Sequence, residues 1–159
     1  MPTTPARREI AFTSIDQVMP DVDRLLAGHT KAGNWSLGQI CNHLTKTVVG
    51  SIEGYDLRPP WVLRYVVAPI FLKRMLKTGR MPTGVKAPAP IAPGQGLDDR
   101  AEAEALRAAL KLFAAHTEPL PKHPLFGRLS HAQFERVHCI HAAHHLSFLH
   151  PVGASGASV

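Results

Sequence analysis

The feature that most constrains this chain is the recurrence of apolar residues at helical spacing behind clear helix starts. Ser36 and Gln39, and again Ser130 and Gln133, stand three residues apart, the spacing of a capping box. In such a box the serine and glutamine side chains bind backbone N–H groups that the first helical turn leaves free. Apolar residues then follow at intervals of three and four, which predicts helices.

Five helices are predicted. They span residues 14–27, 36–55, 60–78, 98 through 113, and 130–149, and no segment shows a convincing strand alternation. Pro20 either kinks the first helix or marks where its regular part begins, and Pro69 must bend the third. Residues 81–97 contain four prolines and three glycines, which predicts an extended connector. Pro151 is expected to end the last helix.

This pattern predicts an all-α protein with a single helical-bundle domain. We expect the domain to span residues 14–151, after an N-terminal extension of residues 1–13 and before a disordered tail of residues 152–159. A short loop joins the first two helices, so we expect them to pack antiparallel. The long stretch between the second and fourth helices leaves room for a crossover.

Composition excludes several classes of protein. The two cysteines, Cys41 and Cys139, are far apart, so no disulfide framework is indicated and a reducing compartment is expected. The first twelve residues contain no apolar run typical of a signal peptide. Arg64 and Pro69 interrupt the longest apolar stretch, which is shorter than the roughly 20 residues of a spanning helix. We therefore expect a cytoplasmic protein.

Positive charge is concentrated in one part of the chain. The formal net charge is +6, and seven of the 18 basic residues lie between residues 58 and 86. They form either an anion-binding face, for nucleic acid or an acidic membrane surface, or, the interpretation we favour, a solvated surface. No recognition motif accompanies the charge, so no nucleic-acid partner is expected. The apolar third helix is suited either to cover a pocket or to form the face of a homodimer.

Histidine is the unusual residue in the composition, because ten are present and five fall between residues 131 and 145. A helix turns by about 100° per residue, so residues three, four or seven apart share a face. His138, His141 and His145 therefore share a face with the apolar Phe134 and Val137. Neutral imidazoles in a core need hydrogen-bond partners, and charged ones cost still more.

A bound metal ion resolves this conflict. His141 and His145 form an HxxxH pair that can hold one ion, and His43, in the middle of the second helix, is the candidate third ligand. Three imidazoles leave coordination positions open, as in catalytic sites. They suit a divalent transition metal such as zinc, nickel, iron or copper rather than calcium or magnesium.

The alternative interpretation is that these are core histidines bonded to backbone carbonyls. His138 and His144 are weaker candidates, either for orienting a ligand or moving a proton, or as packing and surface residues.

Three stretches, 34–44, 123–130 and 141–146, resemble the DinB/YfiT-like metalloenzyme superfamily. They are most similar to an uncharacterised branch of it, defined as a domain of unknown function. The resemblance runs from about residue 12 to residue 151. It implies a four-helix bundle, here with an extra helix and a proline-rich connector between bundle helices two and three. It also implies a metal triad of one histidine on the second helix and an HxxxH pair on the last, which maps to His43, His141 and His145.

Characterised relatives in that superfamily include thiol-dependent S-transferases and isomerases. The resemblance therefore implies a metal-dependent thiol transferase that acts on a low-molecular-weight thiol and an electrophilic small molecule. The alternative is a non-catalytic module that binds a metal or a small ligand. The insertion at residues 61–93 departs from compact members of the superfamily and leaves the substrate open.

Overall fold

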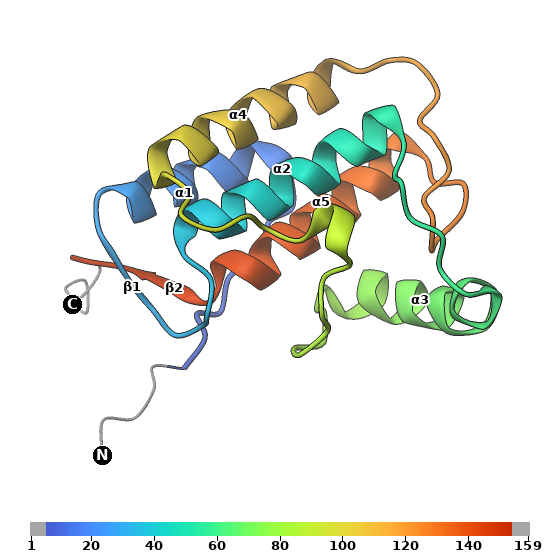
Figure 1. The fold of residues 1–159 in the computed structure, drawn as a ribbon, viewed down its shortest axis with the longest axis horizontal. Helices are drawn as coiled ribbons and strands as arrows, with labels where there is room; N and C mark the ends of the chain where they lie inside the picture. The colour runs from blue at the N-terminus through green and yellow to red at the C-terminus, as the bar shows by residue number, and fades with distance from the viewer. Residues whose placement is uncertain (1–5, 154–159) are drawn as a thin grey trace.

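The computed structural model describes residues 6–153, which fold mostly into helices (Figure 1). Within this range the five helices are α1 (Val18–Leu26), α2 (Leu37–Glu53), α3 (Ala68–Thr78), α4 (Asp99–Ala115) and α5 (His131–Leu146). They confirm the five predicted helices. In this part of the chain no helix has both the length and the apolar character needed to cross a membrane.

The starts of the three long helices follow from local sequence. The Ser36 hydroxyl oxygen accepts a hydrogen bond from the Gln39 backbone N–H at 3.1 Å, and the Gln39 side chain accepts one from the Ser36 N–H at 3.0 Å. Ser130 and Gln133 form the same box at the start of α5. Asp98 caps α4 by accepting a hydrogen bond from the backbone N–H of Ala101. Each side chain satisfies a donor that would otherwise lack a partner.

Two prolines are accommodated in different ways. A 3-10 turn at Ile15–Gln17 precedes α1, so Pro20 lies in the first α-helical turn and marks the beginning of the regular helix. Its missing N–H costs nothing there, because first-turn N–H groups have no helical partner. Pro69 lies at the start of α3, directly after a π-helical stretch at Leu63–Val67. The wider turn gives room to a ring that would clash within a regular α-helix.

Four of the helices pack around a common core. α2 lies against α4 and α5, and α1 lies against α4 and α5 as well. The predicted antiparallel packing of α1 against α2 is not the main contact of either helix, because both pack mainly against the two later helices. Side chains from all four are almost completely inaccessible to solvent, namely Val22, Leu25, Leu37, Ile40, Leu106, Phe113, Phe134 and Leu146. Helix α3 lies apart from this group, beside α5 (Figure 1).

A small antiparallel sheet corrects the all-α prediction. Strand β1 (His29–Lys31) pairs with β2 (Leu149–Pro151), with Lys31 opposite Leu149 and His29 opposite Pro151. Helix α5 consequently ends at Leu146 and not at residue 149 as predicted, since Leu149 is buried in the sheet. The pairing carries the chain after α1 toward the C-terminal end of α5. Three-residue strands are too short to show alternation in a sequence.

The segment before α1 is attached to the rest of the domain. The Arg8 guanidinium forms two hydrogen bonds with the buried Asp21 carboxylate, at 3.0 and 2.7 Å. It also donates to the backbone carbonyls of Leu146 and Leu149. Phe12 is buried in the core. The predicted extension begins with residues 1–5, and the predicted disordered tail includes residues 154–159; both lie outside the described residues.

Candidate metal centre

Helices α2 and α5 bring three histidine side chains to one point. The Nε2 atom of His141 lies 3.0 Å from the Nε2 of His43 and 3.0 Å from the Nε2 of His145. One ligand atom from each of the three residues lies within 4.8 Å of the others, so the group could hold a metal ion. His141 and His145 are one turn apart on α5, while His43 comes from the middle of α2.

The spacing of these atoms is close to that of a transition-metal site. Zinc–nitrogen bonds of about 2.0–2.1 Å in tetrahedral geometry place neighbouring nitrogens about 3.3 Å apart. Around such an ion the two separations of 3.0 Å would open by a few tenths of an ångström, while the third pair, His43 and His145, lies within 4.8 Å. The three imidazoles would occupy three positions around an ion and leave the fourth open to water or substrate.

The orientation of His43 is determined by the connector. Its Nδ1 lies 2.6 Å from the backbone carbonyl oxygen of Ile91. Because a carbonyl only accepts, Nδ1 must carry the proton and Nε2 must present its lone pair to the shared point. Histidines that bind metal ions usually donate their other ring N–H in this way, to a carbonyl, a carboxylate or a water.

A row of polar side chains on α2 holds this connector in place. The Gln39 amide donates to the Gly94 carbonyl, Asn42 accepts from the Gly94 N–H, and Lys46 donates to the Ala92 carbonyl at 2.7 Å. Together with His43 these residues stand three and four apart, so they line one face of the helix. We call residues 91–94 the strap, because they cross that face (Figure 1) and are bonded to it through residues 91, 92 and 94.

Trp35 lies against the histidines from the segment preceding α2. Its ring stacks on His145 with centroids 5.1 Å apart and planes 19° apart, and it also lies 5.1 Å from the His43 ring. The indole therefore covers one side of the cluster and restricts both rings. Neither Trp35 nor Ile91 was predicted as part of the site. Trp35 directly precedes the serine that caps α2, but nothing in the connector sequence marks the Ile91 carbonyl.

All three imidazoles are held in the neutral form. Burial lowers the pKa of His43 below its ordinary value, although its bond to Ile91 opposes the shift. Burial, and then the neighbouring His145 and His43, lower the pKa of His141 well below that value, and burial lowers the pKa of His145 to about 2. Metal ligands must be deprotonated, and near neutral pH none of these imidazoles has to lose the extra proton of an imidazolium before it can bind an ion.

Hydrogen bonding alone does not satisfy this arrangement well. With Nδ1 of His43 protonated, its Nε2 can only accept. The Nε2 of His141 either donates one proton or accepts one, so in either tautomer it can form a full hydrogen bond with only one of His43 and His145. A cation at the shared point would accept lone pairs from all three rings. The donor set therefore fits a metal ion better than it fits a hydrogen-bonded core.

Comparison with known families gives one match. The model of a family described as a protein of unknown function (DUF1569) matches residues 4–152. The chain belongs to DUF1569. No curated protein and no solved structure matches it. The DUF1569 description carries no activity, so the chemistry has to be argued from the site itself.

In this DUF1569 chain the two weaker histidine candidates lie on different sides of the cluster. The Nε2–H of the buried His138 donates to the Ser51 hydroxyl at 3.0 Å, and its ring packs edge-on against Phe113. These are contacts of a core residue. His144 instead lies beside Arg7, with 3.3 Å between its Nδ1 and the guanidinium, and its ring is 4.9 Å from that of His145. Their roles beside the three histidines stay predictions.

This DUF1569 chain also contains a cavity next to His144. It has a volume of about 560 Å³ and lies between the N-terminal segment, the end of α3 and α5. Arg7, Arg80 and Arg136 are among its lining residues, which gives it positive charge. Within the described residues, His144 lines the cavity and the three clustered histidines do not.

The cysteines are unsuited to act as nucleophiles. Burial raises the pKa of the Cys41 thiol to about 12 and that of Cys139 to about 11. The thiolate is the reactive form, and neither residue can supply it near neutral pH. Any thiol chemistry at this site must therefore use a thiol that arrives as substrate.

Proposed function

We propose that this chain binds one divalent transition-metal ion through His43, His141 and His145 and uses it in enzymatic catalysis. The observation that carries the proposal is the convergence of three neutral Nε2 atoms from two helices on one point. Zinc, nickel and iron are the candidate ions, because borderline imidazole ligands suit them.

The reaction we propose is transfer of a low-molecular-weight thiol to an electrophilic small molecule. A bound ion supplies the positive charge that lowers the pKa of a thiol at the open coordination position. The chain supplies orientation, since Ile91 fixes the tautomer of His43 and Trp35 restricts the rings of His43 and His145. Arg7 and Arg80 give the nearby cavity a charge that favours an anionic electrophile.

The same arrangement supports assignment of the chain to the DinB/YfiT-like metalloenzymes as a four-helix bundle. Four helices share the core, and α3 with the connector forms an insertion between α2 and α4. One ligand on the second helix and an HxxxH pair on the last helix agree with the triad of that superfamily. A solved structure of this chain with its ion would test the assignment.

Metal content is the direct test. Protein purified without a nickel column should contain about one equivalent of a transition metal by mass spectrometry, because three preorganised neutral imidazoles bind such ions. His141→Ala and His43→Ala should each lose most of it. His116→Ala, at the end of α4 and outside the cluster, is the matched control and should keep it.

Circular dichroism establishes that each variant is folded. Wild-type protein without metal, which also fails to take up added zinc, nickel or iron(II), would overturn the proposal. Retention of metal in folded His141→Ala would overturn the assignment of the ligands.

The second candidate function is a non-catalytic module that binds a metal or a small ligand. The observation that favours it is the cover over the cluster, because Trp35 and the strap lie against it and the adjacent cavity does not include its ligands. The metal-loaded protein would then show saturable binding without turnover. Turnover of any thiol and electrophile pair from a panel would favour the enzyme over the binding module, provided that His141→Ala abolishes this turnover.

A further inference from the structure

Exposed apolar side chains are concentrated in one short segment. Of the ten large apolar side chains exposed in the described residues, seven lie between Trp61 and Ile70. Trp61, Tyr65 and Ile70 are 70%, 66% and 69% exposed. A patch of this kind on a protein surface marks an interaction site more often than chance. We call the seven exposed apolar residues between Trp61 and Ile70 the apolar face.

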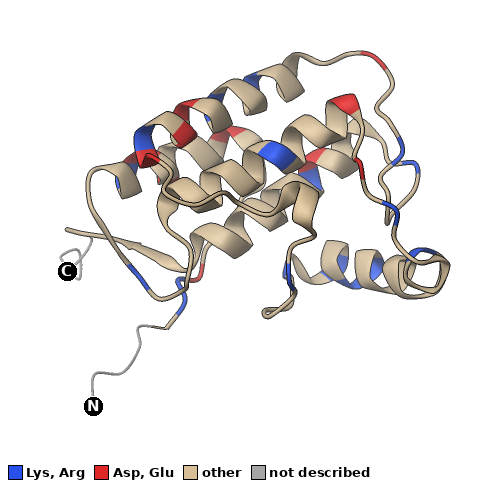
Figure 2. Ribbon diagram, viewed as in Figure 1, with Lys and Arg blue, Asp and Glu red and all other residues tan. Residues whose placement is uncertain are grey.

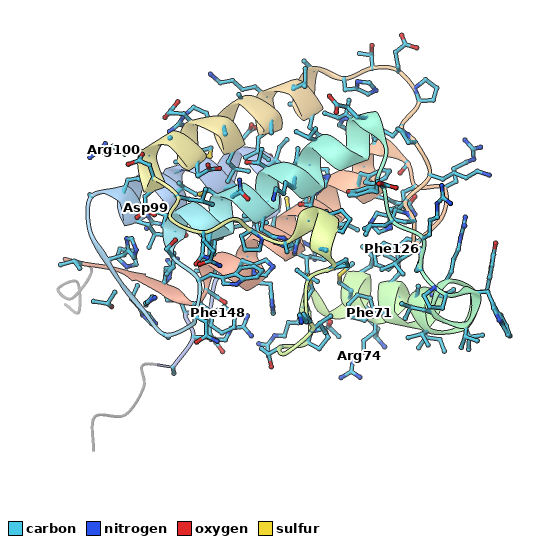
Figure 3. All side chains as sticks on the ribbon, viewed as in Figure 1. Phe71, Arg74, Asp99, Arg100, Phe126 and Phe148 are labelled. Carbon is cyan, nitrogen blue, oxygen red and sulfur yellow. The ribbon has the colours of Figure 1, made fainter. Side chains whose placement is uncertain are left out.

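The apolar face points away from the core. On the inner side of the same helical segment Ala68 and Met75 are buried, and Phe71 stacks on Phe126 with centroids 6.1 Å apart. Figure 3 shows Phe71 directed toward Phe126 and Arg74 directed outward. Val66 and Ile70 stand four residues apart, so they share one side of the helix, and both are exposed.

The segment around this face carries positive charge alone. Residues 57–97 contain seven lysines and arginines and no aspartate or glutamate, which leaves 11 basic and 12 acidic residues for the rest of the chain. Figure 2 shows blue and no red on α3. Among the described residues only Arg80 of the seven forms an ion pair, a 4.0 Å contact with Glu9.

We propose that the apolar face and the basic residues beside it dock onto the surface of an anionic lipid bilayer. A helix with Trp and aliphatic residues on one part of its surface and Lys or Arg beside them is the pattern of interfacial membrane binding. Trp61 and Tyr65 have the amphipathic rings that favour the headgroup region. The anionic headgroups would be met by the basic side chains of the same segment, namely Arg58, Arg64, Lys73, Arg74 and Lys77.

Charge also favours a lipid bilayer over the two other candidate partners, a second copy of this chain and a nucleic acid. A two-fold dimer places the same patch of both copies face to face, which would bring two segments of seven positive charges together without a carboxylate. The phosphates of a nucleic acid would attract the cations. A nucleic acid has no aliphatic surface, however, that would cover the exposed side chains of Val62, Val66 and Ile70. A bilayer with anionic headgroups satisfies both the charge and the apolar side chains.

Vesicle co-sedimentation tests the proposal. The metal-replete full chain should bind vesicles that contain phosphatidylglycerol and should not bind vesicles of phosphatidylcholine alone. Binding should weaken as salt is raised, since surface charges are screened. Fluorescence of Trp61 should shift to shorter wavelength on binding, and Trp61→Phe should remove that shift, because Trp35 is the only other tryptophan.

Two sets of variants separate charge from apolar contact. The triple change Lys73→Glu, Arg74→Glu, Lys77→Glu should weaken binding by about a hundredfold or more, from the loss of three cations near the surface. The matched control reverses two exposed cations of α4, Arg100→Glu and Lys111→Glu, and should bind as wild type does.

The second set tests apolar contact. The double change Val66→Ser, Ile70→Ser should also lose binding. Its control, Leu112→Ser, removes an exposed apolar residue of α4 and should bind as wild type does.

The outcomes are distinct from those of the metal experiments, since every variant here should keep its metal content. Equal binding to neutral vesicles, or no binding to anionic ones, would overturn the proposal. So would a dimer in analytical ultracentrifugation that shields Trp61 without vesicle binding, or binding to DNA or RNA that anionic vesicles fail to compete.

Discussion

Four histidines of α5 lie in surroundings that disfavour the imidazolium form, namely His138, His141, His144 and His145. Burial lowers the pKa of His138 to about 3 and that of His144 to about 4, in addition to the low value at His145. His123, which precedes α5, is lowered to about 4 for the same reason. One helix thus combines metal-ligand geometry and core packing in residues of a single type, and only their neighbours distinguish the two.

These shifts predict acid sensitivity. A histidine with a lowered pKa in the folded state takes up its proton more readily when unfolded, so stability is full above the ordinary value of about 6.5 and falls as pH drops toward the folded value. For His138 this window runs from about 6.5 down to about 3. We expect the free energy of unfolding to fall by about 1–3 kcal/mol per such histidine between pH 7 and 4.

Urea unfolding of metal-free protein across that range measures the effect. His138→Phe should flatten the curve, because it removes one titrating group, even if its own stability at pH 7 is lower. A stability that is unchanged down to pH 4 would contradict the burial of these imidazoles.

At the scale of elements, the strap orients the His43 side chain although it contributes no candidate metal ligand. Lys46 bonds the Ala92 carbonyl, one residue beyond the carbonyl that orients His43. Lys46→Met keeps the length of the side chain and removes the donor. Metal affinity, measured by competition with a chelator, should fall by about tenfold, the smaller end of the effect known for partners of metal ligands. Lys111→Met on α4 is the control.

An unchanged affinity in Lys46→Met would show that the strap holds its position without that bond. The fold should be intact in either case, because Lys46 lies outside the buried core.

The N-terminal segment is the second element with a clear energetic role. Asp21 has a side chain that is 1% exposed and bonds both Arg8 and Arg24. Asp21→Ala leaves the 15% exposed Arg8 side chain without its carboxylate and should cost about 3–5 kcal/mol. Arg24→Ala should cost less than about 1 kcal/mol, since that partner is 67% exposed. Thermal unfolding of the two variants compares them, and equal losses would contradict this ranking.

The sequence predicts best those elements whose capping residues and apolar spacing lie within the element itself. Capping boxes and helical spacing gave α2 and α5 and placed the HxxxH pair on one face. The sheet was missed because β1 and β2 are three residues long and lie at distant points in the chain. The partners of α1 were missed for the same reason, since packing between helices depends on contacts distant in sequence.

At the scale of the whole molecule, the chain has two chemically different sides. The side-chain carboxylates all lie outside residues 57–97, and that segment supplies both the apolar face and the strap. The insertion between α2 and α4 therefore connects the surface proposed to meet a bilayer with the carbonyl that orients a candidate ligand. The positions of its ends were predicted from prolines and glycines, but its contact with His43 depends on the completed fold.

The distance in sequence between the clustered histidines has a consequence for biosynthesis. His43 and His141 are 98 positions apart, so His43 leaves the ribosome long before its partners do. The carbonyl of Ile91 is translated in between, and the α5 pair follows it. A triad built this way is incomplete until α5 has been synthesised. Loading of the proposed ion would therefore require a polypeptide that includes α5, and translation products truncated before α5 should not withdraw metal from the cell through this site.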